Sequence, residues 1–148
     1  MTELVASARR RARTGWPRLH TRLYQWTGGR LGSRFGRLEQ VLITTTGRRS
    51  GLPRTTPLAG VPHGDRLLLV ASNWGQEHHP AWFHNLQAHP EVLIRRGRRT
   101  VPMRARPATD DEREALWPVV VDAFRGFAGY AERTTRTIPV VICEPVGA

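Results

Sequence analysis

The sequence contains no lysine, so all 23 of its Lys+Arg positions are arginine and the net charge of +11 depends on guanidinium groups. The missing lysine excludes Schiff-base chemistry by a lysine amine. An excess of arginine favours anionic partners, which include nucleic acid, an acidic membrane surface and a small ligand with phosphate or carboxylate groups. Charge alone does not choose among these three.

Cysteine is also scarce, because Cys143 is the single one in 148 residues and no internal disulfide can form. It ends the apolar stretch 138–143, and no histidine or carboxylate pattern accompanies it. We therefore expect a buried, unreactive thiol rather than a nucleophile.

Long apolar runs are absent as well. None reaches the roughly 20 residues that span a bilayer, and the N-terminus lacks the apolar stretch and cleavage site of a signal peptide. We therefore expect a cytoplasmic protein. A length of 148 residues fits one globular domain with a single core.

Residues 1–37 differ from the rest, because arginine is interleaved there with aromatic and aliphatic residues. Trp16, Leu19, Leu23 and Trp26 recur at helical spacing, which places an apolar stripe beside an arginine-rich face. We predict a basic amphipathic arm that is partly helical. Two interpretations stay open: peripheral contact with an anionic membrane, on the inner face of the cell membrane, or packing on the parent domain.

Residues 38–148 are expected to form the main domain. Short apolar and β-branched runs between turn residues predict strands at 40–46, 54–61, 66–72, 91–95, 99–106 and 138–144. Helices are expected at 80–88 and at 110–123, where Thr109 precedes three acidic residues. Many short strands without regular strand and helix alternation predict a mainly β (α+β) fold, a small antiparallel barrel with two peripheral helices.

The segment TTTGRRSGLPR, residues 44–54, predicts a strand that runs into a glycine-bounded turn. Ser50 and free backbone N–H groups can donate to phosphate oxygens, and the arginine side chains can bind phosphate or carboxylate with two hydrogen bonds. The pattern is not a Walker loop, which needs lysine. An anion cradle and an ordinary charged turn both fit these residues.

A second cluster, ASNWGQEHHPAWFHNL, covers residues 71–86 and holds three histidines. Glu77, His78 and His79 are adjacent, so they cannot share a helical face as the ligands of HExxH do. A metal site is the weaker interpretation. In the stronger one, Ser72 and Asn73 meet the polar edge of a flat heterocycle that Trp82 and Asn85 enclose.

Three aromatic residues follow the second helix at a spacing of three, at Phe124, Phe127 and Tyr130. Gly126 and Gly129 lie between them and argue against a rigid helix. The rings are expected either to pack in the core or to form a mobile apolar lid over a substrate pocket, with the Tyr130 hydroxyl as its polar tip.

In this order and spacing, the three clusters resemble the deazaflavin (F420)-dependent nitroreductase family of actinobacteria, which includes F420H2-dependent quinone reductases. The resemblance covers residues 41–145. It rests on TTGRRSGLPR, Pro57-Leu58, Ala71-Ser72, HPAWFHNL, ATDDERE and RTIPVVICEP. These motifs are far more specific together than any one alone.

The resemblance implies a split β-barrel like that of FMN-binding oxidoreductases, with reduced coenzyme F420 in a cationic groove; FMN is the less favoured cofactor. The phosphate and polyglutamate tail of F420 fits the arginine excess. Carried over position by position, the cofactor contacts are Arg48, Arg49, Ser50, Arg54, Thr55, Thr56, Pro57, Leu58, Ala59, Val70, Ala71, Ser72, Asn73, Ala81, Trp82, Phe83, His84, Asn85 and Phe127.

The resemblance also implies hydride transfer from F420 to a small organic acceptor, a quinone such as menaquinone or a nitroaromatic. Ser72 and Tyr130 are the predicted catalytic residues: Ser72 to polarise the ring or acceptor oxygen, and Tyr130 to orient the acceptor. Phe124, Phe127 and Tyr130 occupy the family's substrate-side tyrosine positions. Two of those hydroxyls are missing here, which counts against prodrug-type nitroreduction.

Two other functions remain open on the residues alone. Arginine with aromatic residues is also the composition of a basic nucleic-acid-binding module, although that function leaves the cluster at 71–86 unexplained. A non-catalytic F420-binding protein would share the fold without turnover. We expect a small-molecule acceptor and no specific nucleic acid; the sequence does not determine the oligomeric state.

Overall fold

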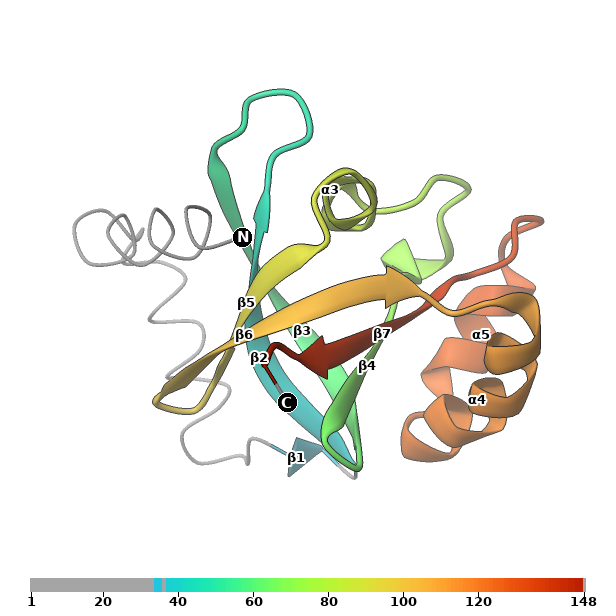
Figure 1. Cartoon of the computed structure of the whole chain (residues 1–148). Coiled ribbons are helices and arrows are strands. Elements are labelled where there is room, and N and C mark those ends of the chain that lie inside the picture. The colour runs from blue at the N-terminus through green and yellow to red at the C-terminus, as the bar shows by residue number, and fades with distance from the viewer. Residues whose placement is uncertain (1–33, 36, 148) are drawn as a thin grey trace.

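The computed structural model describes residues 34–35 and 37–147, and its centre is a closed antiparallel barrel of six strands (Figure 1). The barrel order is β2, β3, β4, β7, β6, β5, and β5 pairs back on β2. A short strand, β1 (Arg34–Phe35), pairs antiparallel with the start of β2. The strands are β2 (Leu38–Thr46), β3 (Pro53–His63), β4 (Arg66–Val70), β5 (Glu91–Arg96), β6 (Arg99–Pro107) and β7 (Val140–Pro145). The expected barrel is confirmed.

Three α-helices lie outside the barrel in the described part of the chain: α3 (Ala81–Ala88), α4 (Asp110–Ala123) and α5 (Gly126–Glu132). A short 3-10 helix, η1 (Asn73–Gly75), follows β4. The helix predicted at 110–123 has the same bounds as α4. The helix predicted at 80–88 corresponds to α3, which begins one residue later, at Ala81. None of these helices is long and apolar enough to cross a membrane.

The prediction that the glycines prevent a helix after α4 is wrong, because α5 contains both Gly126 and Gly129. Phe127 is buried among Val120, Ile142 and other residues of the outer core, so burial of its ring outweighs the low helix propensity of glycine. Gly126 also has a steric reason to be there. A Cβ at this position would lie 2.3 Å from the Phe124 ring.

Alternate side chains of β4 separate two apolar layers. Leu67 and Leu69 face the barrel interior, whereas Leu68 and Val70 face the layer covered by α4 and α5. Cys143 lies in the interior and is fully buried. The expected burial of the thiol is confirmed, and it raises the thiol pKa to about 12.

Nearly all of the predicted N-terminal arm, residues 1–37, lies outside the described residues. Its helical stripe, its contact with a membrane and its boundary with the main domain stay predictions.

Candidate functional site

The barrel is split along one edge of β3. Residues 53–60 pair with β2, from Thr46 opposite Pro53 to Glu39 opposite Gly60. On its other edge β3 pairs with β4 only from Val61 to His63. Among the described residues, no other backbone hydrogen bond reaches 53–60. The outward N–H and C=O groups of this segment are therefore available to a ligand.

A groove of about 1070 Å³ lies along this open edge. It brings together β2 and β3 with the turn between them, the turn and helix after β4, and residues 124–130. The predicted site residues that line it are Arg48, Thr56, Pro57, Leu58, Ala59, Val70, Ser72, Asn73, Ala81, Trp82, His84, Phe124, Phe127 and Tyr130. The volume and shape suit a small heterocyclic ligand together with a second small molecule.

Other predicted site residues lie behind or beyond the groove. Ala71 and Phe83 are buried in the barrel core, and the Thr55 hydroxyl bonds to that of Thr44 at 2.8 Å. The remaining members of this group are Arg49, Ser50, Arg54 and Asn85. These residues shape the groove or extend from its mouth rather than form its walls.

Asn85 fixes the position of the glycine-bounded turn. Its buried side-chain oxygen accepts a hydrogen bond from the Arg48 N–H at 3.0 Å, and its amide donates to the Thr45 hydroxyl at 3.2 Å. Within the turn, the Gly51 N–H donates to the Gly47 carbonyl at 2.8 Å. Helix α3 thereby holds the Arg48 backbone at the groove.

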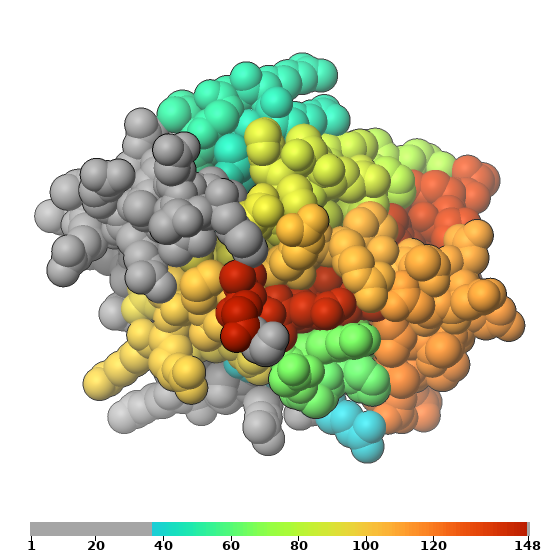
Figure 2. Space-filling view, viewed as in Figure 1, coloured from blue at the N-terminus to red at the C-terminus, as the bar shows by residue number. Residues whose placement is uncertain are grey.

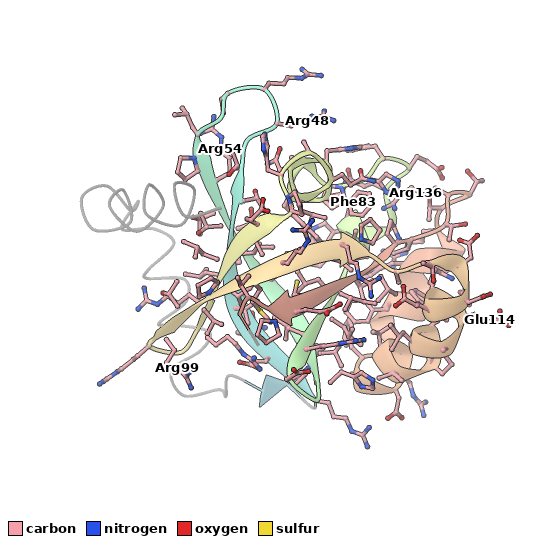
Figure 3. The ribbon with its side chains drawn as sticks, viewed as in Figure 1. Arg48, Arg54, Phe83, Arg99, Glu114 and Arg136 are labelled. Carbon is pink, nitrogen blue, oxygen red and sulfur yellow. The ribbon has the colours of Figure 1, made fainter. Side chains whose placement is uncertain are left out.

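The turn between β2 and β3 projects from the molecule beside α3 (Figure 2). Arg48 and Arg54 extend from this projection (Figure 3), and Arg49 is exposed at its tip. Arg48, Arg49 and Arg54 have no ion pair within the described residues. Unpaired guanidinium groups with exposed hydrogen-bond donors are suited to phosphate and carboxylate ligands.

The acidic residues that form ion pairs lie elsewhere in the described part of the molecule. Glu39 receives two hydrogen bonds from Arg96, and Glu112 receives two from Arg106. No carboxylate is among the described residues that line the groove. The groove thus combines Arg48 with three histidines and no compensating negative charge.

The turn after β4 has a strained backbone. Asn73 and Trp74 have φ values of 45° and 58°, and Gly75 follows at 81°. Left-handed geometry is unfavourable for residues with a Cβ, and such strain persists where surrounding contacts fix the chain. The contacts here come mainly from one side chain, Arg136.

Arg136 joins this turn to the segment before β7. Its guanidinium donates to the carbonyl oxygens of Ser72 at 2.8 Å, Gln76 at 2.8 Å and Ala71 at 3.2 Å. It also lies 2.9 Å from His79 Nδ1. Because arginine has only donors, Nδ1 accepts and the His79 proton is on Nε2.

Two histidines of the groove are held towards the neutral form. Desolvation is the main cause that lowers the pKa of His79, and Arg136 and His84 add to it. Desolvation likewise lowers the pKa of His84, with a further contribution from Arg48. Both rings are therefore neutral at physiological pH, and neither adds a full charge to the groove.

Aromatic rings form the end of the groove away from the arginine turn. Phe124 directly follows α4, and Phe127 and Tyr130 belong to α5. The Phe124 ring lies 5.1 Å from that of Phe127 in an edge contact and 6.4 Å from that of Tyr130 in a tilted one. Phe127 is buried while Tyr130 is partly exposed, so the three serve both the core and the groove.

The described residues include no group of three His, Cys, Asp or Glu side chains that could hold a metal ion. The histidines instead have other contacts. His79 lies 4.8 Å from the Phe83 ring and 5.7 Å from that of His84. The cluster at 71–86 forms one wall of the groove, as the ring-binding interpretation requires.

Fold and site together define a split β-barrel protein with a groove that holds an unpaired arginine and, among its described lining residues, no carboxylate. Comparison with known proteins specifies which kind. The chain belongs to the F420H(2)-dependent quinone reductase family, whose model matches residues 16–145. It is therefore an F420H2-dependent reductase.

Individual relatives agree with this assignment. An F420H(2)-dependent quinone reductase of Mycobacterium tuberculosis is 39% identical over 129 residues, which cover 84% of this chain and 87% of that protein. A solved structure of an F420-H2 dependent reductase is 40% identical, with a TM-score of 0.65 over 71% of this chain and 93% of that one. A second solved structure, described as a domain-swapped dimer, is 34% identical, with a TM-score of 0.67 over 86% of this chain and 95% of that one.

Residues that sequence analysis did not place at the site also line the groove: Leu38, Gln40, Trp74, His78, His79 and Pro80. The role of Arg136 in holding one wall of the groove was not predicted either, although Arg136 is the first residue of the RTIPVVICEP motif. Its contacts reach 57–65 residues along the chain, so no local pattern indicates them. Trp74 had a usable signal, because a large apolar ring stands directly before Gly75 in an otherwise polar turn.

Proposed function

We propose that this chain transfers a hydride from reduced F420 to a quinone, with nitroaromatic compounds as poorer acceptors. The observation that carries the proposal is the groove itself. It has unpaired arginine at one end, an open strand edge along its side and aromatic rings at the other end. Reduced F420, when bound, supplies the hydride; the protein supplies binding, alignment and exclusion of water.

The residues of the groove fit this cofactor. Arg48, with Arg49 and Arg54 beyond the groove, would hold the phosphate and carboxylate groups of the tail. The free backbone groups of 55–59 would meet the polar edge of the ring system, and Trp82 and Ala81 would enclose it. The absence of carboxylates among the described lining residues suits a ligand with several negative charges.

We propose Ser72 and Tyr130 as the residues that act on the reacting groups. The Ser72 carbonyl is fixed by Arg136, while its hydroxyl has no partner within the described residues and can donate into the groove. The Tyr130 hydroxyl is likewise without a partner there. Ser72 would stabilise negative charge that develops on an oxygen, and Tyr130 would orient the acceptor.

Titration of the protein with F420 and, in parallel, with FMN tests the proposal. Fluorescence monitors binding, and menadione is then added to the reduced complex. We expect tight F420 binding, weaker FMN binding and reoxidation that depends on the acceptor. Arg48→Ala should raise the Kd for F420 about tenfold, since one charge-assisted contact is lost. Failure of the unmodified protein to bind F420 would reject the proposal.

Arg99→Ala is the matched control for Arg48→Ala. Arg99 is exposed at the start of β6, in the hairpin far from the groove (Figure 3). Arg99→Ala removes the same charge as Arg48→Ala but no contact in the groove. The Kd of this variant for F420 should therefore stay close to that of the unmodified protein. Equal effects of the two substitutions would show that net charge, rather than a contact in the groove, controls binding.

A further inference from the structure

Trp74 is a large aromatic residue that the protein keeps in solvent. Its relative exposure is 69%, compared with 39% for Leu52 and 40% for Val146, the other exposed large apolar residues in the described part of the chain. It nevertheless lines the groove. Its ring makes an edge contact with Tyr130, with centroids 5.9 Å apart and an interplanar angle of 79°. Core packing does not explain such a residue.

The backbone holds Trp74 in an unfavourable conformation, with φ of 58° and ψ of 22°. Glycine would adopt this geometry without strain, yet the glycine of this turn is at position 75. Conformational strain of this kind is concentrated at sites where a side chain must be presented in one direction. The indole is therefore present for a reason other than the stability of the turn.

Several contacts prevent the turn from relaxing. A Cβ at Gly75 would lie 2.9 Å from the Tyr130 carbonyl oxygen, so the turn is pressed against α5. Arg136 binds the carbonyl oxygens of Ser72 and Gln76 on either side of it. The Asn73 amide donates to the His78 carbonyl at 3.0 Å. The backbone that carries the indole is thus held against the helix that carries Tyr130.

We propose that Trp74 and Tyr130 form a subsite that selects acceptors with an extended planar aromatic ring system. This inference rests on the proposed function. Phe124 and Phe127 lie at the same end of the groove, and the arginine turn lies at the other, so the pair faces the acceptor rather than the anionic tail. Two rings set at a steep angle offer both a face and an edge to a third ring.

Trp74→Gly separates this role from a structural one. Glycine relieves the left-handed strain, so the variant should have a Tm at least equal to that of the unmodified protein. We expect its KM for menadione, which has two fused rings, to rise about tenfold. The KM for single-ring benzoquinone and the Kd for F420 should change by less than about twofold. Trp74→Phe should recover most of the menadione KM.

Val146→Ala is the control, because it shortens another exposed apolar side chain that does not line the groove; its KM values should not change. An unchanged menadione KM in Trp74→Gly would overturn the inference, and so would a parallel rise in the Kd for F420, which would assign the indole to the cofactor. If the unmodified protein binds F420 but transfers no hydride to either quinone, the proposed function itself fails.

Discussion

The Arg136 guanidinium donates to three carbonyl oxygens and to the His79 ring, and so fixes one wall of the groove. Arg136→Leu removes all four contacts and leaves those carbonyls with water or no partner. Because the side chain is partly exposed, we expect a loss of about 2 kcal/mol in the free energy of unfolding, and a Tm about 6 °C lower. Thermal unfolding measures this, with Arg99→Leu as the exposed control.

The same substitution should change the titration of His79. Arg136 is the second cause of the lowered His79 pKa, after desolvation, so its removal should raise that pKa. An NMR titration measures it, and the signal is assigned by its loss in His79→Gln. A His79 pKa that does not rise in Arg136→Leu would contradict the observed contact.

His79 also makes stability depend on pH, with a definite sign. Its folded pKa lies below the ordinary value of 6.5, so the unfolded chain binds the proton more readily. The contribution of neutral His79 to the free energy of unfolding is complete above pH 6.5 and is lost as the pH falls through the pKa of the folded state. The midpoint for thermal unfolding should therefore decrease on mild acidification, and less so in His79→Gln.

Sequence alone could predict which residues lie at the groove only where those residues belong to a motif. Arg48, Ser72 and Trp82 stand in short local patterns, and all three line the groove. Arg136 and His79 depend on a contact between segments 57 residues apart, and the left-handed backbone at Trp74 depends on α5. Such positions are set by tertiary structure, which no local spacing records.

At the scale of elements, α4 shows how completely a local signal can fix a boundary. The Thr109 hydroxyl accepts from the Glu112 N–H at 3.2 Å, and the Glu112 carboxylate accepts from the Thr109 N–H at 2.9 Å. This reciprocal capping box explains why the helix starts where its sequence indicates. The opposite case is α5, which local propensity argued against and the burial of Phe127 produced.

Thr109→Ala should lower the free energy of unfolding by about 1 kcal/mol, since the helix loses its N-cap acceptor. Thr109→Ser keeps a hydroxyl and should retain most of the stability. Thermal or urea unfolding compares the three proteins. Equal losses in both variants would mean that the Thr109 methyl group, and not the cap, stabilises this end of α4.

The capping box also has a pH dependence. Hydrogen bonds from Arg106 are the first cause that lowers the Glu112 pKa to about 2, from an ordinary value of 4.5. Its folded pKa lies below the unfolded one, so its contribution is complete above pH 4.5 and is lost as the pH falls towards 2. The difference in the free energy of unfolding between Glu112→Gln, which removes the titrating carboxylate, and the unmodified protein should shrink over that range.

At the scale of the whole molecule, the strand pattern was sufficient for the barrel but not for its opening. Alternating apolar residues and turn signals predict six antiparallel strands. The split arises because residues 53–60 of β3 pair with β2 on one edge but have no partner strand on the other, where β4 pairs only with residues 61–63. The register between β3 and β4 determines the length of this unpaired edge, and no local sequence pattern indicates that register.

Charge is distributed unevenly over the whole molecule, and this should control how fast the cofactor binds. The net charge is +11, acids such as Glu39 and Glu112 are paired away from the groove, and three arginines without an ion pair among the described residues lie at the turn beside its mouth. A ligand with a multiply charged tail is attracted over a distance that salt shortens. We expect the association rate constant of F420 to fall about tenfold from low to physiological salt.

Stopped-flow fluorescence measures this rate, and two comparisons identify its source. Arg48→Ala should reduce the dependence on salt, because a charge at the groove itself is lost, whereas Arg99→Ala should reduce it less. FMN, with a single phosphate, should show a shallower dependence than F420. If the salt dependences of the unmodified protein, Arg48→Ala and Arg99→Ala with F420 were parallel, the arginines at the mouth of the groove would not guide the ligand, and the excess of arginine over acid would need another explanation.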